Sequence, residues 1–292
     1  MHADQIDVTE QVVAALVADQ FPRWRGRPVR AITSHGTVNA LFRLGDEVVL
    51  RFPLRPSRDP GLLAELIAEQ ENARRIAAHV PVAVPEPLAL GEPGEGYDGP
   101  WTAYRWIPGE TGRIGDPAAF ARDLAGFVRA LHGIDAGGRR WDGRGRGGPL
   151  HAQDDWVQES LAGSGHLTDT SRLGKIWARC RDIEMPAGGV WIHTDLMPGN
   201  LLTRAGRLAA VIDLGPGLVG DPAVDLMPAW NMLPPAARET YRDALAVDDA
   251  TWERGRGWAL VQAIGALWYY VETNPVMAAT ARHTLDAILE SD

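Results

Sequence analysis

The sequence predicts an α+β fold in which a small antiparallel sheet precedes a larger, mainly helical part. Residues 29–52 consist of short runs rich in valine, leucine and phenylalanine, separated by turn residues, which is typical of antiparallel strands. Residues 116–132 and almost all residues after 234 instead carry apolar side chains at helical spacing. With 292 residues, 45 % of them hydrophobic, the chain can form one large domain or two lobes.

The first elements are a helix and a three-stranded sheet. Apolar residues at helical spacing predict the opening helix over residues 8–21. Three antiparallel strands are expected within residues 29–52, and the segment 34–37 forms the loop between the first two. The pair Gly45-Asp46 is typical of a tight hairpin turn, so it predicts the connection between the last two strands.

A charged residue interrupts the third strand. Residues 47–53 form an apolar run that carries Arg51 in its middle. The next helix is predicted over residues 61–79, where Glu65 and Glu69 lie one turn apart on the same face. Either glutamate could therefore pair with Arg51.

The middle of the chain continues with a strand, a helix and a glycine-rich loop. The aromatic residues 101–107 predict a strand that stops at Pro108-Gly109, and residues 116–132 predict a long helix. Glycine and arginine nearly alternate over residues 137–148, which predicts a mobile loop. Helical spacing returns over residues 154–181. Three acidic residues of that segment could face a cationic substrate or form a solvated helix face: Asp154, Asp155 and Glu159.

The stretch from Val190 to Leu226 holds the candidate reaction centre. Transfer of a phosphoryl group needs a carboxylate that accepts the hydroxyl proton, and it needs oxygen ligands for Mg²⁺. Asp195 can supply the carboxylate, and Asn200 and Asp213 can supply the ligands. The Leu-Met-Pro-Gly segment between Asp195 and Asn200 turns the chain, so that both side chains can face one cavity. A short apolar run that predicts a buried strand ends just before Asp213.

This stretch resembles the catalytic core of the aminoglycoside phosphotransferase family, which has the protein-kinase-like fold. The matching patterns are H-x-D-x-x-x-x-N, I-D-L-G and G-D-P-x-x-D-L. The resemblance implies two lobes, a nucleotide-binding lobe over residues 1–107 and a catalytic, substrate-binding helical lobe over residues 108–292. It also implies ATP or GTP, bound between the lobes, together with Mg²⁺.

The resemblance assigns roles to five residues of the central stretch. Asp195 corresponds to the catalytic base of the family, and Asn200 and Asp213 correspond to its two metal ligands. His193 and Asp225 correspond to residues that support the loop between them without taking part in the chemistry.

For the nucleotide, the resemblance implies binding residues in the first lobe. The family normally has a lysine at the position of Arg51, and the only lysine of this chain is Lys175. Arg51 would therefore hold the phosphates and pair with Glu69, whose position resembles that of the family's helix glutamate. The loop after the first strand would cover the phosphates, and the adenine would lie against the last strand. The implied residues are Ser34, Gly36, Arg51, Glu69, Tyr104, Arg105 and Ile107.

Composition limits the partners and the location. The 38 acidic and 29 basic residues give a net charge of −9, which disfavours nucleic acid and favours cationic partners in a general way. No apolar run approaches eighteen residues and the N-terminus is polar, so we expect a cytoplasmic protein that does not enter a membrane. The single cysteine, Cys180, cannot form an intrachain disulfide. A monomer or a homodimer is expected.

These observations predict an ATP-dependent O-phosphotransferase that acts on a small hydroxylated molecule. One candidate acceptor is an aminoglycoside-like, cationic antibiotic, which would make the protein a resistance enzyme. An alternative is a metabolic kinase for an amino-alcohol or a sugar, and a third reading is a nucleotide-binding protein without catalysis. Protein-kinase activity is disfavoured, because the eleven residues between Asp213 and Asp225 are too few for an activation loop.

Overall fold

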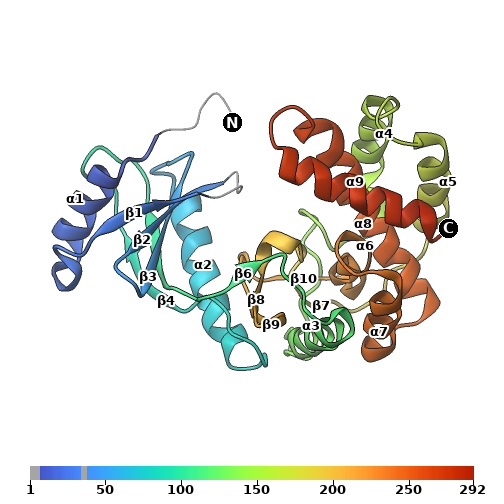
Figure 1. Ribbon diagram of the computed structural model, residues 1–292, viewed down its shortest axis with the longest axis horizontal. Coiled ribbons are helices and arrows are strands. Elements are labelled where there is room, and N and C mark those ends of the chain that lie inside the picture. The colour runs from blue at the N-terminus through green and yellow to red at the C-terminus, as the bar shows by residue number, and fades with distance from the viewer. Residues whose placement is uncertain (1–6, 34–37) are drawn as a thin grey trace. The chain divides into compact units, whose positions relative to one another are not determined.

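The structure, a computed structural model, describes residues 7–33 and 38–292, which form two compact units (Figure 1). Unit 1 comprises the chain up to Ala78 together with Val84–Pro108. Unit 2 comprises His79–Ala83 and Gly109–Asp292. In the described part of the chain, no helix combines the length and the apolar character needed to cross a lipid bilayer.

Unit 1 is built on an antiparallel sheet, as the sequence predicts. Its described strands follow the order β1-β2-β3-β5-β4, and α2 lies against β4 through a hydrogen bond of 2.8 Å from Gln70 Nε2 to the Ala89 carbonyl oxygen (Figure 1). The elements are α1 (Glu10–Gln20), the 3₁₀ turn η1 (Pro22–Trp24), β1 (Val29–Ile32), β2 (Asn39–Leu44), β3 (Val48–Pro53), α2 (Pro60–Ala77), β4 (Pro87–Gly91) and β5 (Trp101–Arg105).

The two faces of this sheet have different environments because side chains alternate along each strand. On β3, Val48, Leu50 and Phe52 are buried in the hydrophobic core that includes α1. Phe52 stacks on Trp101 of β5, with ring centroids 5.0 Å apart and an interplanar angle of 14°. Arg51 therefore lies on the opposite face of β3, together with the polar contacts described below.

Unit 2 is mainly helical and contains two small sheets, ordered β6-β8-β9 and β10-β7 among its described strands. The predicted helix over 154–181 is interrupted and forms two helices. The elements are β6 (Glu110–Thr111), α3 (Pro117–His132), η2 (Leu150–Gln153), α4 (Asp154–Gly163), α5 (Thr170–Cys180), β7 (Val190–Ile192), η3 (Pro198–Asn200), β8 (Leu201–Arg204), β9 (Arg207–Val211), β10 (Leu218–Gly220), η4 (Pro222–Leu226), α6 (Pro228–Asn231), α7 (Pro235–Leu245), α8 (Asp249–Tyr270) and α9 (Pro275–Glu290).

Helix α8 is the centre of unit 2 and is buried on most of its circumference. A buried ion pair fastens it to η4: Arg254 Nε lies 2.8 Å from Asp221 Oδ2, and both side chains are at most 3 % exposed. Arg254 also donates to Asp221 Oδ1 at 3.2 Å and to the Glu184 carbonyl oxygen at 3.1 Å. Because both charges are satisfied by hydrogen bonds, the pair fixes the position of η4 on α8.

Removal of the negative charge by Asp221→Asn should destabilise unit 2 by about 3–5 kcal/mol, because it leaves the Arg254 guanidinium buried without its counter-charge. Urea unfolding followed by tryptophan fluorescence measures the loss. The matched control is Glu110→Gln, which breaks an exposed ion pair with Arg113 and should cost less than about 1 kcal/mol. Equal losses for the two variants would contradict this role of the buried pair.

Candidate active site

A tight hairpin brings the two predicted metal ligands together. Ala205 and Gly206, which join β8 to β9, have φ angles of +50° and +76°, as a two-residue type I′ turn requires. Asn200 precedes β8 and Ile212-Asp213 follow β9, so both lie at the open end of this hairpin. The Ile212 amide donates to the Asn200 carbonyl oxygen at 2.9 Å. The sequence predicts the second strand of this hairpin, but β8 was not expected.

The side chain of Asn200 is oriented by Asp195. Its Nδ2 atom donates to the Asp195 carbonyl oxygen at 2.9 Å and to Asp195 Oδ2 at 3.0 Å. The side-chain oxygen of Asn200 is then the atom that remains for a cation. Asp213 follows β9 in the left-handed conformation, with φ of +64°. The structure therefore brings the side chains of Asp195 and Asn200 into contact. Asp213 directly follows Ile212, whose amide bonds to the Asn200 backbone.

Asp225 holds the segment before Asp195. Its carboxylate is completely buried and accepts the His193 amide at 3.0 Å and the Thr194 amide at 2.9 Å. His132 Nε2 of α3 lies 3.0 Å from Asp225 Oδ2, and the Tyr241 hydroxyl donates to the Asp225 carbonyl oxygen at 2.8 Å. Asp225 lies in η4, which begins three residues earlier, because Asp221 caps it.

His193 connects the same segment to the end of β9. Its Nε2 atom lies 3.0 Å from the Ile212 carbonyl oxygen, and its Nδ1 atom accepts the Asp195 amide at 3.3 Å. These partners require the neutral ring with its proton on Nε2. Since β9 also leads to Asp213, His193 ties the Asp195 segment to the Asp213 segment.

Thr194 has a backbone conformation that is unusual for a β-branched residue, with φ of +68°. Both of its peptide groups are held: its amide donates to Asp225, and its carbonyl oxygen accepts Arg146 Nη1 at 2.8 Å. Strain of this kind persists only where the surroundings determine the conformation, and it occurs often at functional sites.

Two residues that the sequence did not indicate contact the carboxylate of Asp195. Arg146 Nη1 and Gln262 Nε2 each donate to Asp195 Oδ1 at 2.7 Å. Arg146 belongs to the glycine- and arginine-rich loop that was expected to be mobile, and Gln262 belongs to α8. The only signal that could have indicated Arg146 is its position in a loop rich in cationic residues.

A comparison with family models matches residues 29–258 to the phosphotransferase enzyme family. The chain belongs to this family. The match includes every residue described above around Asp195 except Gln262, which lies beyond its end, and it confirms the family that the motifs between His193 and Asp225 indicate. No curated protein sequence matches the chain significantly.

Solved structures show the kinase-like α+β fold that the resemblance implied. The GDP and kanamycin complex of APH(2″)-IIia has a TM-score of 0.71 and 18 % identity, over 96 % of this chain and 99 % of that chain. A macrolide 2′-phosphotransferase from Brachybacterium faecium has a TM-score of 0.61 and 24 % identity, over 95 % and 97 %. The streptomycin-ATP ternary complex of APH(2″)-IIa has a TM-score of 0.57 and 16 % identity, over 98 % and 97 %.

In unit 1 of this family member, Arg51 forms an ion pair with Glu69, whereas Glu65 is exposed. Both partners are largely buried, with 18 % and 15 % of their side chains exposed. The Tyr104 hydroxyl donates to Glu69 Oε1 at 3.2 Å. Burial, and then the negative charge of Glu69, raise the pKa of Tyr104, so its phenol remains a donor at neutral pH. Tyr104 thus fixes Glu69, which in turn fixes Arg51.

The other residues expected to bind the nucleotide are less well supported. The Arg105 amide donates to the Glu86 carbonyl oxygen at 2.9 Å, so this amide is already used within the sheet. The Arg105 side chain also pairs with Glu86, and its hydrogen bond lowers the pKa of that carboxyl group. Ile107 is half-buried. Ser34 and Gly36 lie outside the described residues.

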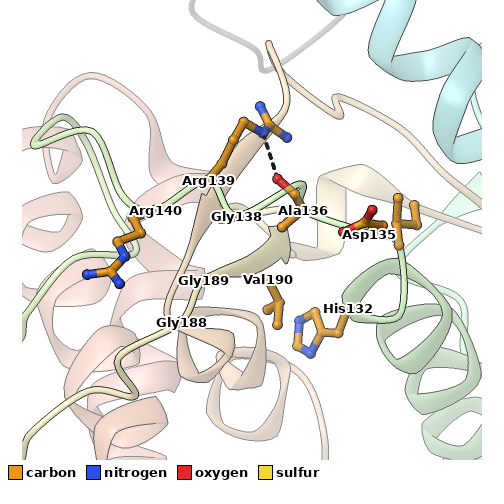
Figure 2. A pocket seen from close by; sticks show the side chains of 10 residues that line it. His132, Asp135, Ala136, Gly138, Arg139, Arg140, Gly188, Gly189 and Val190 are labelled. Carbon is orange, nitrogen blue, oxygen red and sulfur yellow. Dashed lines mark hydrogen bonds between the residues drawn. The ribbon is translucent and has the colours of Figure 1, made fainter.

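A cavity of about 340 Å³ opens between the end of α3 and the start of β7 (Figure 2). Its wall includes His132, and Arg139 lies at its edge with Nε 3.4 Å from the Ala136 carbonyl oxygen (Figure 2). None of Asp195, Asn200 and Asp213 lines it. This cavity is therefore separate from the group of residues around Asp195, and His132 links the two through its contact with Asp225.

We expect Asp225→Ala to release the loop, because the His193 and Thr194 amides lose their buried acceptor. Hydrogen exchange of a peptide that spans residues 190–196 should become at least tenfold faster, since an unsatisfied buried amide costs about 1–3 kcal/mol. The rate of hydrogen exchange in peptides from α9 reports any destabilisation of the whole protein.

The control for this experiment is Asp142→Ala, which removes the carboxylate that accepts the Arg144 amide at 3.0 Å in the exposed loop. It should leave exchange at residues 190–196 unchanged. If Asp225→Ala also leaves that peptide at the wild-type rate, Asp225 does not hold the loop.

Proposed function

We propose that the protein transfers the terminal phosphoryl group of ATP or GTP to a hydroxyl group of a small molecule, with Asp195 as the catalytic base. The observation that carries this proposal is the contact between Asp195 and Asn200, at the open end of the hairpin that continues into Asp213. In this proposal unit 1 is the nucleotide-binding lobe, and unit 2 is the catalytic lobe.

The hydrogen bonds of Asp195 indicate which oxygen accepts the proton. Its Oδ1 atom already accepts two donors, Arg146 and Gln262, and its Oδ2 atom accepts one, Asn200. A carboxylate oxygen accommodates about two such bonds. The acceptor hydroxyl would therefore donate to Oδ2. The proton then moves to Oδ2 as the hydroxyl oxygen bonds to phosphorus and the bond from phosphorus to the nucleoside diphosphate breaks.

The residues near Asp195 fit a magnesium ion. Asn200 and Asp213 offer hard oxygen donors, which Mg²⁺ prefers. Bound there, Mg²⁺ would neutralise the charge of the phosphates. Asp195 accepts both hydrogen bonds of the Asn200 amide nitrogen, so the side-chain oxygen of Asn200 would be the atom that holds the ion.

Arg51 would contact the nucleotide phosphates in place of the family's lysine. A guanidinium group can donate to a carboxylate and to phosphate oxygens at the same time, because its donors point in several fixed directions. The pairing with Glu69 supports this role. The complexes with GDP and with ATP among the similar structures support a nucleoside triphosphate as the donor substrate.

Two classes of acceptor remain candidates. The similar structures include complexes with kanamycin and with streptomycin and a macrolide 2′-phosphotransferase, which supports an antibiotic acceptor and a role in resistance. The second candidate is a hydroxylated metabolite such as a sugar, and the positive charge of Arg146 beside Asp195 favours it. A protein that binds nucleotide without catalysis would have no need for the Asp195–Asn200 contact.

Loss of the base should lower phosphoryl transfer by about 10²- to 10⁴-fold in Asp195→Ala, whereas nucleotide binding should persist. Release of nucleoside diphosphate in the presence of Mg²⁺ and a panel of hydroxylated acceptors measures the rate, and calorimetry measures binding. Asp286→Asn, on the exposed face of α9, is the matched control and should retain full activity.

Unchanged transfer by Asp195→Ala would show that another group is the base. A wild-type protein that binds nucleotide and transfers phosphate to no acceptor would instead favour the non-catalytic alternative.

A further inference from the structure

The turn between Asp195 and Asn200 is only partly held by its own main chain. The Met197 amide donates to the Asp195 carbonyl oxygen at 2.8 Å, and the Asn200 amide donates to the Met197 carbonyl oxygen at 2.9 Å. Between these two acceptors lies the Leu196 carbonyl oxygen, which accepts no main-chain amide in the described part of the chain. Leu196 is completely buried, so this oxygen needs a partner from elsewhere in the protein.

Asn231 of α6 is that partner. Its Nδ2 atom donates to the Leu196 carbonyl oxygen at 2.9 Å and to Met197 Sδ at 3.4 Å. The residue is 2 % exposed, and no described residue donates to its Oδ1 atom. All hydrogen bonds of this side chain within the described protein are therefore bonds to the turn. A flipped amide would place Oδ1 against the Leu196 carbonyl oxygen, so the contact with this acceptor fixes the orientation.

Helix α6 has only four residues, and its neighbours fix its position. It packs against α7, α8 and α9. Arg238 Nε of α7 donates to the Ala229 carbonyl oxygen at 2.7 Å, and Arg238 is itself buried. The ring of Trp230 lies against that of Trp252 of α8, with centroids 4.8 Å apart. Asn231 is thus presented to the turn by three helices of unit 2.

The chain around Asp195 is consequently held on both sides. Asp225 of η4 accepts the amides of the two residues before Asp195, and Asn231 binds the residue after it. Only Met227 separates η4 from α6, so both contacts come from one continuous segment. The contact with Asn231 is the one that lies between Asp195 and Asn200 in the chain.

We propose that Asn231 is a positioning residue for phosphoryl transfer. By binding the Leu196 carbonyl oxygen, it sets the distance and orientation of Asp195, the proposed base, relative to Asn200, the proposed magnesium ligand. Asn231 is buried beneath the turn and acts through it, without touching the nucleotide or the acceptor. This inference rests on the proposed function and adds a residue to the same site.

The test is Asn231→Leu, which removes the donor and keeps a similar volume. The value of kcat should fall by about 10- to 100-fold, because a displacement of about 1 Å between reacting groups has an effect of this size. KM for the acceptor should change less than threefold, and the Mg²⁺ concentration for half-maximal rate should rise about tenfold as Asn200 moves. Release of nucleoside diphosphate measures these values, with the acceptor that wild type phosphorylates fastest.

Hydrogen exchange shows whether the change is local. A peptide that spans residues 195–202 should exchange at least fivefold faster in Asn231→Leu, whereas peptides from α9 should exchange at the wild-type rate. If Asn231→Leu does not fold, Asn231→Ala replaces it, because it adds no bulk, and the same pattern of kcat, KM and Mg²⁺ dependence is expected.

The matched control is Thr284→Val. Thr284 of α9 is 2 % exposed and donates to the Thr280 carbonyl oxygen at 2.8 Å, so the variant also loses one buried hydrogen bond at nearly constant volume. It should retain the wild-type kcat, KM and Mg²⁺ dependence. Equal losses in Thr284→Val and Asn231→Leu would overturn the inference, because they would reduce the role of Asn231 to general stability.

Two further results would also overturn it: a folded Asn231→Leu variant with wild-type kcat and Mg²⁺ dependence, or one in which only KM rises. If wild type transfers phosphate to no acceptor, the proposed function fails, and calorimetry with a non-hydrolysable ATP analogue then decides the role of Asn231. Mg²⁺ should strengthen binding of the analogue about tenfold less in Asn231→Leu than in wild type. An unchanged effect of Mg²⁺ would contradict the positioning of Asn200 by Asn231.

Discussion

The arrangement of the site depends on one buried carboxylate. Asp225 is inaccessible to solvent, and it accepts the amides of two consecutive residues, His193 and Thr194. Helix α3 reaches the same carboxylate through His132, and α7 reaches the Asp225 backbone through Tyr241. A buried carboxylate is tolerated only when its oxygens are satisfied by donors. The donors that satisfy Asp225 are the ones that set the path of the chain into Asp195.

A second constraint is the short hairpin of β8 and β9. Asn200 and Asp213 are thirteen positions apart in the sequence, and the hairpin brings them to the same end of two paired strands. The carboxylate of Asp195 accepts Asn200 at the end of this hairpin and two further donors, Arg146 and Gln262. Three bonds leave one position on Oδ2, so the same contacts that orient the proposed base also define where an acceptor can bind.

The central residues of the candidate site could be predicted because they are close together in the sequence. Asp195 and Asn200 are five residues apart on one turn, and Asp213 follows an apolar strand. The residue pattern and its spacing therefore suffice to predict that these residues belong to one site. The contacts of Arg146 and Gln262 with Asp195 span 49 and 67 residues, and no local pattern encodes them. Strand β8, LLTR, was missed because only its first two residues are apolar and it directly follows the turn after Asp195. The bond from the Arg105 amide to Glu86 could not be predicted, because Glu86 precedes β4 and becomes adjacent to Arg105 only in the folded sheet.

The account is tested most directly by ³¹P NMR of mixtures of the protein, Mg²⁺, ATP and each member of a panel of hydroxylated acceptors. It predicts a new phosphate monoester signal that grows as the signal of the terminal phosphate of ATP declines in equal amount. A spectrum in which only inorganic phosphate forms, or in which ATP binds and remains unchanged with every hydroxylated acceptor offered, would contradict the assignment of residues 193–225 as a phosphoryl-transfer centre.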